Sequence, residues 1–287
     1  MTDIAVEHIS YQIHEQMIIN DLSLQVNRGE RLALLGHNGS GKTTLINIMT
    51  GLIKADRGKV TYTDNKKSFD KIKNITGIIW DNISIFPLLK VNEVVHFIAH
   101  LYSIDSDAYT DTYHLLELQD IQNKFMRKLS RGEKKRVEIL LSTMHSPRLL
   151  IMDEPMASID PLLREKIWNN IFLKNKTLFF TTHQWEEAKK YATSIAMIHK
   201  GRLLNKPASY KELLASFKFT IKIITTKDVI PDNSNDTFLY ENEKTKIALL
   251  QNKHDPIIDY IRQKTVNYSI MPVELEDIYR YLIKTKE

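Results

Sequence analysis

The sequence predicts an α/β fold built on a parallel sheet, with a small α+β appendage after it. Three observations support this prediction. Short apolar segments alternate with amphipathic helical patterns over most of the chain, which is typical of parallel strands joined by helical crossovers. A glycine-rich loop at 36–44 joins an apolar run to a helical one. The composition shifts after Pro207, and we expect one domain at 1–215 and a smaller one at 216–287.

The first strands are indicated by side-chain periodicity. Residues 3–13 alternate apolar and polar side chains at a period of two, and 19–30 form a second strand closed by an Asn-Arg-Gly turn. The run at 31–35 predicts a short buried strand, and 44–49 predicts a helix that Gly51 ends. Further strands of this domain are expected at 54–64, 75–82, 149–152 and 177–183, with a hairpin at 194–204.

Helical patterns fill the rest of the larger domain. Residues 83–125 are mainly helical, and with the following helix they give a helical subdomain at about 83–145. Ser130 and Glu133 have the spacing of a capping box at the start of that following helix. Further helices are expected at 161–172, which opens on a proline, and at 185–192.

The appendage mixes helix and strand patterns. Residues 229–237 lack apolar periodicity and are expected to form a loop. Helices are expected at 210–217, 254–265 and 275–284, and strands at 217–226, 237–241, 245–251 and 266–273. We therefore expect a small α+β unit at this end of the chain.

Composition restricts the compartment and the partners. The chain has 287 residues, no cysteine and a formal net charge of +5. The lack of cysteine excludes disulfides and fits a reducing compartment. No apolar run approaches the ~20 residues that span a bilayer, and the N-terminus has no basic-then-apolar signal pattern. Lysine and glutamate alternate over most of the chain, so we attribute the charge to solvated side chains and expect no nucleic-acid partner.

The glycine-rich loop has the features of a phosphate-binding site. It reads GHNGSGKTT and fits G-x-x-x-x-G-K-[ST]. Its glycines let backbone N–H groups converge on phosphate oxygens, and the following helix adds partial positive charge. Lys42 can reach the terminal phosphates, and the Thr43 hydroxyl can ligate Mg²⁺. The expected nucleotide contacts are Gly36, His37, Asn38, Gly39, Ser40, Gly41, Lys42, Thr43 and Thr44.

Two carboxylates and a histidine follow buried strands. The apolar strand at 149–152 ends in Asp153 and Glu154. A carboxylate at such a strand tip can hold Mg²⁺, and its neighbour can orient or deprotonate an attacking water. His183 ends a later strand, about thirty residues after Glu154. A single histidine at a strand end is usually structural, but its order in the chain favours a functional role here.

Together these segments resemble the ATP-binding cassette (ABC) ATPases, and the resemblance covers residues 3–215. It rests on the phosphate loop, the strand ending in Asp153 and Glu154, the signature-like LSRGE at 129–133, the SID segment at 158–160 and His183. The resemblance implies a P-loop NTPase fold with a mixed sheet and a helical subdomain. It also implies ATP and Mg²⁺ as ligands, with catalytic roles for Lys42, Glu154 and His183 and metal contacts from Thr43 and Asp153.

The family works as a head-to-tail dimer, and the resemblance implies the same for this chain, as a homodimer. Each ATP would lie between the phosphate loop of one subunit and the signature segment of the other. Ser130 and Gly132 would then contact the γ-phosphate in trans. Asp160 would link the two sites across the dimer interface. His183 would hydrogen-bond the γ-phosphate and the water held by Glu154.

Departures from the family pattern lie beside the phosphate loop. The signature has Arg131 where glycine is usual and Glu133 where glutamine is usual. Asp81 occupies the glutamine position of the Q-loop. An aspartate there can ligate Mg²⁺ more strongly than an amide, but it would repel the γ-phosphate without the metal. The alternative is that Asp81 is a solvated turn residue.

The position expected to support the adenine is also unusual. The family stacks an aromatic side chain on adenine some two dozen residues before the phosphate loop, and Ile13 occupies that place here. An isoleucine can give apolar contact only. Tyr11 lies two residues earlier, on the same face of a regular strand, and is the alternative stacking residue.

The resemblance implies the ATP-hydrolysing subunit of a bacterial ABC transporter, peripheral to the cytoplasmic face of the cell membrane. A separate permease chain would supply the pore, and Phe86, Leu88 and Leu89 are candidates for its docking groove unless they pack within the helical subdomain. The ending PVELEDIYRYLI, at 272–283, resembles that of exporters for drugs, antimicrobial peptides and lipids, so we expect export. The alternatives are a nucleotide-switched regulatory module with little turnover and a soluble ABC protein without a transport role.

Overall fold

Two compact units make up the chain, Met1–Pro207 and Ala208–Glu287. The computed structural model describes residues 1–62, 68–81, 86–174, 176–226, 238–241, 245–264 and 267–286. The division falls after Pro207 and not at 215 because helix α7 (Tyr210–Ser216) packs with the second unit, where its Leu214 joins an apolar cluster. The start of the predicted helical subdomain, Ile83, lies outside the described residues.

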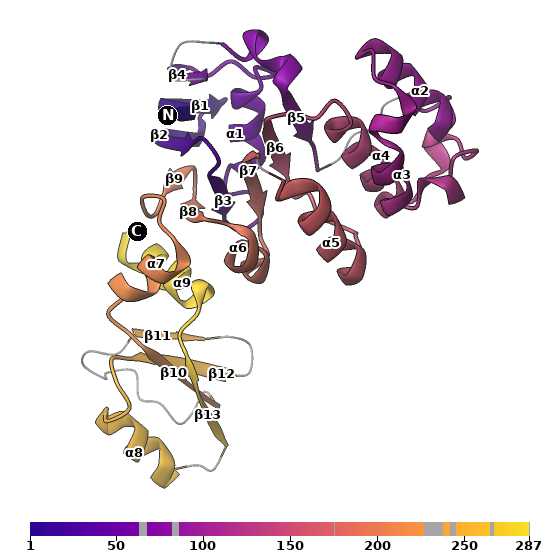
Figure 1. Ribbon diagram of the computed structural model, residues 1–287. Helices are drawn as coiled ribbons and strands as arrows, with labels where there is room; N and C mark the ends of the chain where they lie inside the picture. Colours follow the sequence, from indigo (N-terminus) through magenta and orange to yellow (C-terminus); the bar gives the residue numbers. More distant parts are fainter. Residues whose placement is uncertain are drawn as a thin grey trace. The chain divides into compact units, whose positions relative to one another are not determined.

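A six-stranded sheet forms the centre of the first unit, in the order β5-β6-β7-β3-β8-β9 (Figure 1). Its strands are β5 (Thr76–Ile79), β6 (Leu149–Asp153), β7 (Thr177–Thr182), β3 (Arg31–Leu35), β8 (Ser194–His199) and β9 (Arg202–Leu203). All are parallel except β9, which pairs antiparallel with β8. Strands β6 and β7 are buried along their whole length, as continuous apolar runs in a covered parallel sheet predict. The expected α/β fold with a mixed sheet is confirmed.

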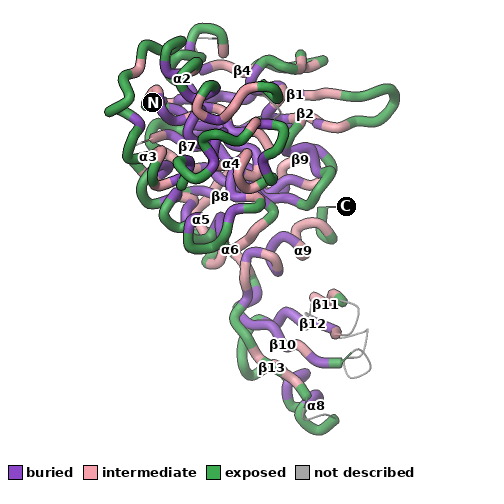
Figure 2. Tube along the Cα trace, turned by 90° about the vertical axis from the view of Figure 1, so that its right-hand side faces the viewer, coloured by how far each residue is buried: buried purple, intermediate pink, exposed green. Residues whose placement is uncertain are grey.

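A three-stranded antiparallel sheet packs on the same core. Its order is β2 (Gln16–Asn27), β1 (Thr2–Ile13) and β4 (Arg57–Tyr62). One apolar cluster joins Ile4 of β1, Leu34 of β3 and Ile46 of α1 (Lys42–Met49). Figure 2 shows the buried residues gathered at the centre of this unit, around β7 and β8. This core fixes β3 and α1, and therefore the loop between them.

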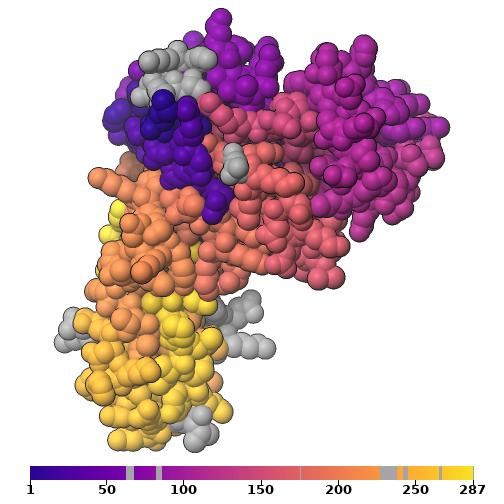
Figure 3. All heavy atoms as spheres, viewed as in Figure 1, coloured from indigo at the N-terminus to yellow at the C-terminus, as the bar shows by residue number. Residues whose placement is uncertain are grey.

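The helices beside the sheet are shorter than the patterns predict. They are α2 (Val91–Leu101), α3 (Thr110–Leu115), α4 (Arg131–Thr143), α5 (Pro161–Ile167) and α6 (Trp185–Tyr191). The pattern at 107–122 gives only α3 and short 3-10 turns, because Glu117 takes a left-handed conformation with φ 55°. Likewise α5 ends at Ile167 and continues as one π-helical turn, Trp168–Phe172. Helices α2 and α3 form a lobe of the first unit that projects from the sheet (Figure 1, Figure 3).

The second unit is a four-stranded antiparallel sheet with helices. Its strand order is β11 (Phe238–Glu241), β12 (Thr245–Leu250), β10 (Ile221–Thr226) and β13 (Tyr268–Pro272), accompanied by α7, α8 (Pro256–Lys264) and α9 (Leu275–Lys286). Alternate residues of β12 serve two clusters: Ala248 packs with Ile258 and Ile261 of α8, whereas Leu249 packs with Phe219. Both faces of the sheet are therefore covered. All residues of the expected loop at 229–237 lie outside the described residues.

Candidate nucleotide-binding site

The phosphate loop connects β3 to α1 and depends on its glycines. Gly41 has φ 107°, and a Cβ there would lie 2.8 Å from Cδ1 of Ile19. A Cβ at Gly36 would lie 2.6 Å from both the Ile198 carbonyl oxygen and Ser40 Oγ. Larger residues at either place would displace the core or the loop. The loop is thus pressed against the sheet with its backbone close to its surroundings.

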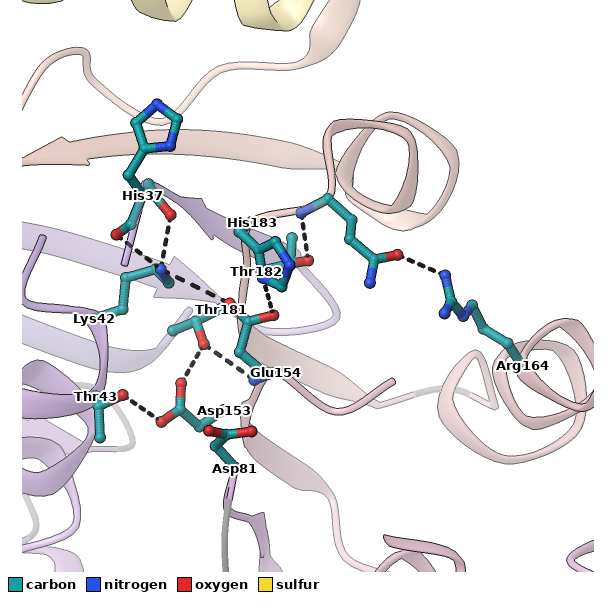
Figure 4. A network of polar contacts seen from close by, with 12 residues as sticks. His37, Lys42, Thr43, Asp81, Asp153, Glu154, Arg164, Thr181, Thr182 and His183 are labelled. Carbon is teal, nitrogen blue, oxygen red and sulfur yellow. Dashed lines mark hydrogen bonds and ion pairs between the residues drawn. The ribbon is translucent and has the colours of Figure 1, made fainter. Parts of the chain in front are cut away.

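Lys42 is folded back over its own loop. Its Nζ donates to the carbonyl oxygens of Gly36 and His37 at 2.7 and 3.2 Å, and lies 3.7 Å from Oε1 of Glu154 (Figure 4). The side chain is only 6% exposed, and this burial lowers its pKa although Glu154 and Asp153 oppose the shift. A phosphate oxygen could replace the two carbonyls as the acceptor for this ammonium group.

Asp153 is held by two threonine hydroxyls. Thr43 Oγ1 donates to its Oδ2 at 2.7 Å, and Thr181 Oγ1 donates to its Oδ1. Thr181 Oγ1 also accepts from the backbone N–H of Glu154 at 3.2 Å. Asp153 and Thr181 are register partners on β6 and β7, so the contact follows from the strand pairing. The sequence patterns did not indicate Thr181 as a site residue. The feature that could have indicated it is the pair of threonines at 181–182, which ends an otherwise apolar strand.

Glu154 lies between a cation and a histidine. One carboxylate oxygen faces Lys42, and the other lies 2.9 Å from Nδ1 of His183. The Glu154 side chain is 13% exposed, whereas that of His183 is 49% exposed. Both groups follow the carboxyl ends of neighbouring parallel strands, β6 and β7. The arrangement gives an oriented carboxylate beside a half-exposed imidazole ring.

A cavity of about 440 Å³ brings most of the predicted residues together. Its wall consists of Ile13, Ile18, Asn38, Gly39, Gly41, Lys42, Thr43, Thr44, Asp81, Asp153 and Glu154. Ile18 was not predicted, because its position depends on how β2 returns beside β1. With Ile13 it gives the cavity an apolar part of its wall, in addition to the charged residues. The volume suits a small-molecule ligand.

Tyr11 does not line this cavity. It packs against the hydrophobic core of the first unit. The pairing of β1 with β2 shifts register here: Tyr11 pairs with Ile19 and Gln12 with Met17, so the extra residue of the bulge, Ile18, lies on β2. Of the two candidates for adenine contact, Ile13 lines the cavity and Tyr11 does not.

The charges of the cavity fit a divalent cation. Its wall carries three carboxylates, Asp81, Asp153 and Glu154, against one ammonium group, that of Lys42. Anionic phosphates would be repelled here without a counter-ion. Mg²⁺ is held by one or two carboxylates together with phosphate oxygens and water, and Thr43 with Asp153 offers such donors. In addition, Ser40 Oγ is buried without a hydrogen-bond partner among the described residues, which leaves an oxygen for a ligand.

The three residues expected to act across a dimer interface, Ser130, Gly132 and Asp160, lie outside the cavity of their own chain. Ser130 caps α4, where its Oγ accepts from the N–H of Glu133 at 3.3 Å, so the predicted capping box is confirmed. Gly132 follows, and a Cβ there would lie 2.6 Å from the Ser158 carbonyl oxygen. Asp160 caps α5 by accepting from the N–H of Leu163 at 3.0 Å. These residues have structural roles within the chain.

Comparisons with known proteins agree with this site. A model of the family described as ABC transporter matches residues 19–157. The linearmycin resistance ATP-binding protein LnrL of Bacillus subtilis (strain 168) is 31% identical over 208 residues, which cover 69% of this chain and 67% of that protein. The spermidine/putrescine import ATP-binding protein PotA of Protochlamydia amoebophila (strain UWE25) is 31% identical over 211 residues, 70% of this chain and 56% of that protein. The chain thus spans little more than half of PotA.

Solved structures support the same fold. The structure of an ATP binding subunit of an ABC transporter matches with a TM-score of 0.67 at 23% identity, over 75% of this chain and 93% of that chain. The relatives include proteins named for import, so membership alone does not fix the direction of transport. In the part of the chain that the structure describes, no helix is long and apolar enough to cross a bilayer. The chain belongs to the ABC transporter family of ATP-binding domains, which bind and hydrolyse ATP.

Proposed function

We propose that this chain is the ATP-hydrolysing subunit of an ABC transporter, and that it powers export of a peptide, drug or lipid through a separate permease. The observation that carries the proposal is Glu154, held between Lys42 at 3.7 Å and His183 at 2.9 Å at the edge of the nucleotide cavity. A carboxylate fixed in this way can accept a proton from a water molecule beside the γ-phosphate.

Each residue of the site then has a distinct task. Lys42 binds the β- and γ-phosphates after releasing the carbonyls of its own loop. Glu154 orients the water and takes its proton, and His183 holds Glu154 and the γ-phosphate. Thr43, Asp153 and Asp81 would hold Mg²⁺, which would offset negative charge on the phosphates. Ile13 and Ile18 give the adenine apolar contact without aromatic stacking.

A second copy of the chain completes the site in this proposal. Ser130 Oγ accepts its hydrogen bond from Glu133, so its hydroxyl hydrogen is available to donate to a γ-phosphate from the partner. The N-terminus of the 13-residue helix α4 adds partial positive charge at the same place. Asp160, besides capping α5, would lie at the dimer interface.

The permease is proposed to dock on the lobe formed by α2 and its preceding loop, at the cytoplasmic face of the cell membrane. Phe86 and Leu88 are exposed, and Phe86 meets the exposed Phe97 with ring centroids 5.4 Å apart. Exposed Leu101 extends this apolar patch along α2. Leu89 is partly covered, so it contributes less to the docking surface than Phe86 and Leu88. Apolar patches of this kind mark sites for partner proteins.

Export rests on the ending at 272–283, whose Val273, Leu275 and Ile278 are buried in the second unit. These apolar side chains of the ending therefore help to form the core of this unit. The test is reconstitution with the permease in vesicles whose cassettes face outward. Export predicts that ATP added outside drives substrate into the vesicles. Release of preloaded substrate on adding ATP would indicate import instead and would contradict the proposed direction.

A regulatory module with little turnover is the second candidate. The observation that favours it is the ion pair between Asp81 and Arg131. This pair holds Asp81, which lines the nucleotide cavity, in a contact within its own chain. The two functions differ in turnover. A transport ATPase should hydrolyse ATP in the 1–100 s⁻¹ range or so known for phosphoryl-transfer enzymes once its permease is present. A regulatory module should form an ATP-dependent dimer whose hydrolysis rate the permease leaves unchanged.

A further inference from the structure

A second cavity in the first unit has a strongly basic wall. It encloses about 480 Å³. Three cationic side chains line it, those of Arg148, Lys174 and Lys176, and no carboxylate does among the described residues of its wall. Polar side chains also line it, those of Thr112 of α3, Ser146 after α4 and Asn170 in the π-helical turn.

This cavity is separate from the nucleotide site. Arg148 immediately precedes β6, and Lys176 immediately precedes β7, so both lie at the amino ends of these parallel strands. Asp153 and Thr181 lie at the carboxyl ends of the same strands, where the nucleotide cavity is. The two cavities therefore lie at opposite ends of the strands of one sheet.

The two lysines of the wall have no carboxylate partner in the part of the chain that the structure describes. Neither Lys174 nor Lys176 forms an ion pair with a described carboxylate, whereas Arg148 binds Oδ1 of Asp3 at 3.1 Å. Asp3 is also engaged by Arg28 and by Thr177 Oγ1, so it has little capacity left to neutralise the lysines. Burial and the neighbouring Lys174 lower the pKa of Lys176 to about 8. Lys174 and Arg148 are exposed and Lys176 is half-buried, and a bound anion would offset the repulsion among these like charges.

We propose that this cavity binds a phosphate group, carried by a small soluble molecule or by a lipid headgroup. Lys174, Lys176 and Arg148 supply the charge, and Thr112, Ser146 and Asn170 can supply hydrogen bonds to the remaining oxygens. The volume holds a small phosphorylated molecule. This inference does not depend on ATP hydrolysis or on the direction of transport.

Pyrophosphate binding measured by calorimetry tests the proposal, with Lys42→Ala in every variant so that the nucleotide loop does not contribute. Lys176→Gln and Lys174→Gln should each weaken binding about tenfold, as expected for losing a charge-assisted hydrogen bond. Lys166→Gln removes an exposed lysine of α5 that does not line the cavity, and it should bind like the parent. Equal losses in all three variants, or none in the two cavity variants, would overturn the proposal.

Two further measurements identify the source and the chemistry. Sedimentation with phosphatidylglycerol vesicles, against phosphatidylcholine vesicles, should depend on Lys174 and Lys176 if the phosphate belongs to a lipid, and pyrophosphate binding alone indicates a soluble ligand.

Sulfate keeps its charge between pH 7 and 9, so its affinity should fall over that range as Lys176 loses its proton. The charged or titratable groups around Lys176 are Lys174, Arg148, Asp3 and His145. A sulfate affinity that stays constant over this range would contradict the role of Lys176.

Discussion

Asp81 and Arg131 form an ion pair in which the Arg131 guanidinium lies 2.9 Å from Oδ1 of Asp81. The resemblance to the ABC pattern aligns Asp81 with the Q-loop and Arg131 with the signature segment, and at both positions it expects a different residue. The pair joins the nucleotide cavity, which Asp81 lines, to the first turn of α4. A metal ion bound to Asp81 would therefore compete with Arg131 for the charge of this carboxylate.

This competition predicts a change in metal dependence. Arg131→Ala frees Asp81 and should lower the Mg²⁺ concentration for half-maximal ATP hydrolysis about two- to fivefold, since the side chains are 59% and 40% exposed and such pairs contribute at most ~1 kcal/mol. Arg131→Lys, which keeps the charge, is the control. In an Asp81→Gln background the Arg131→Ala change should have no effect. Equal shifts in both backgrounds would show that the ion pair is not the cause.

The proposed dimer predicts a change of mass with ATP. Glu154→Gln should slow hydrolysis enough for ATP and Mg²⁺ to hold two copies together, measured by light scattering. Adding Ser130→Ala should weaken this dimer about tenfold per site, because a hydrogen bond to a charged phosphate is lost. Ser106→Ala, at an exposed serine in the same lobe, is the control. A Glu154→Gln protein that stays monomeric at every ATP concentration would contradict the shared site.

The stability of the first unit should depend on the ionisation of Glu187. Burial raises the pKa of Glu187, although hydrogen bonds from Thr182 and Trp168 oppose the shift. The folded state then binds the proton more tightly than the unfolded chain, so stability falls as the pH rises above the ordinary value of 4.5. Glu187→Gln keeps an acceptor for Trp168 and cannot ionise. Its melting temperature should decline less between pH 5 and 7.5 than that of the wild type, and parallel declines would refute this explanation.

In the second unit, Asp277 is the buried carboxylate on which stability depends. It is fully buried, binds Lys222 Nζ at 2.9 Å, accepts from the N–H of Glu274 at 2.7 Å and accepts from the Tyr240 hydroxyl. Asp277→Ala leaves Lys222 with only the half-exposed Glu274 as an ion partner and removes the acceptor of the Tyr240 hydroxyl, so it should lower the free energy of unfolding of this unit by about 2–4 kcal/mol. Asp259→Ala, at an exposed carboxylate of α8, should cost less than ~1 kcal/mol. Hydrogen exchange of β10 and β12 in the full chain measures both.

Local patterns were sufficient for much of the fold and for the phosphate loop. The loop and the strand ending in Asp153 are short segments whose glycines and apolar runs determine their own conformation. The capping box of Ser130 and Glu133 is equally local. The ion pair of Asp81 with Arg131 links residues 50 positions apart, and no periodicity could indicate it.

What the sequence did not predict depends on contacts between distant segments or on single backbone angles. The bulge that places Ile18 beside the cavity arises from the pairing of β2 with β1. Glu117, with φ 55°, interrupted a pattern that otherwise favours one helix. Helix α7 has an ordinary amphipathic sequence, and only its packing on the second unit assigns it there. Thr181 lies beside Asp153 because β6 and β7 pair in register.

The central claim is that Glu154 serves as the base for ATP hydrolysis, and the steady-state release of phosphate tests it most directly. Glu154→Gln should lower kcat about 10²- to 10⁴-fold, as expected for removing a general base, while ATP binding is retained. Glu165→Gln, an exposed glutamate of α5 paired with Lys190, should match the wild type. Hydrolysis by Glu154→Gln at the wild-type rate would contradict the account.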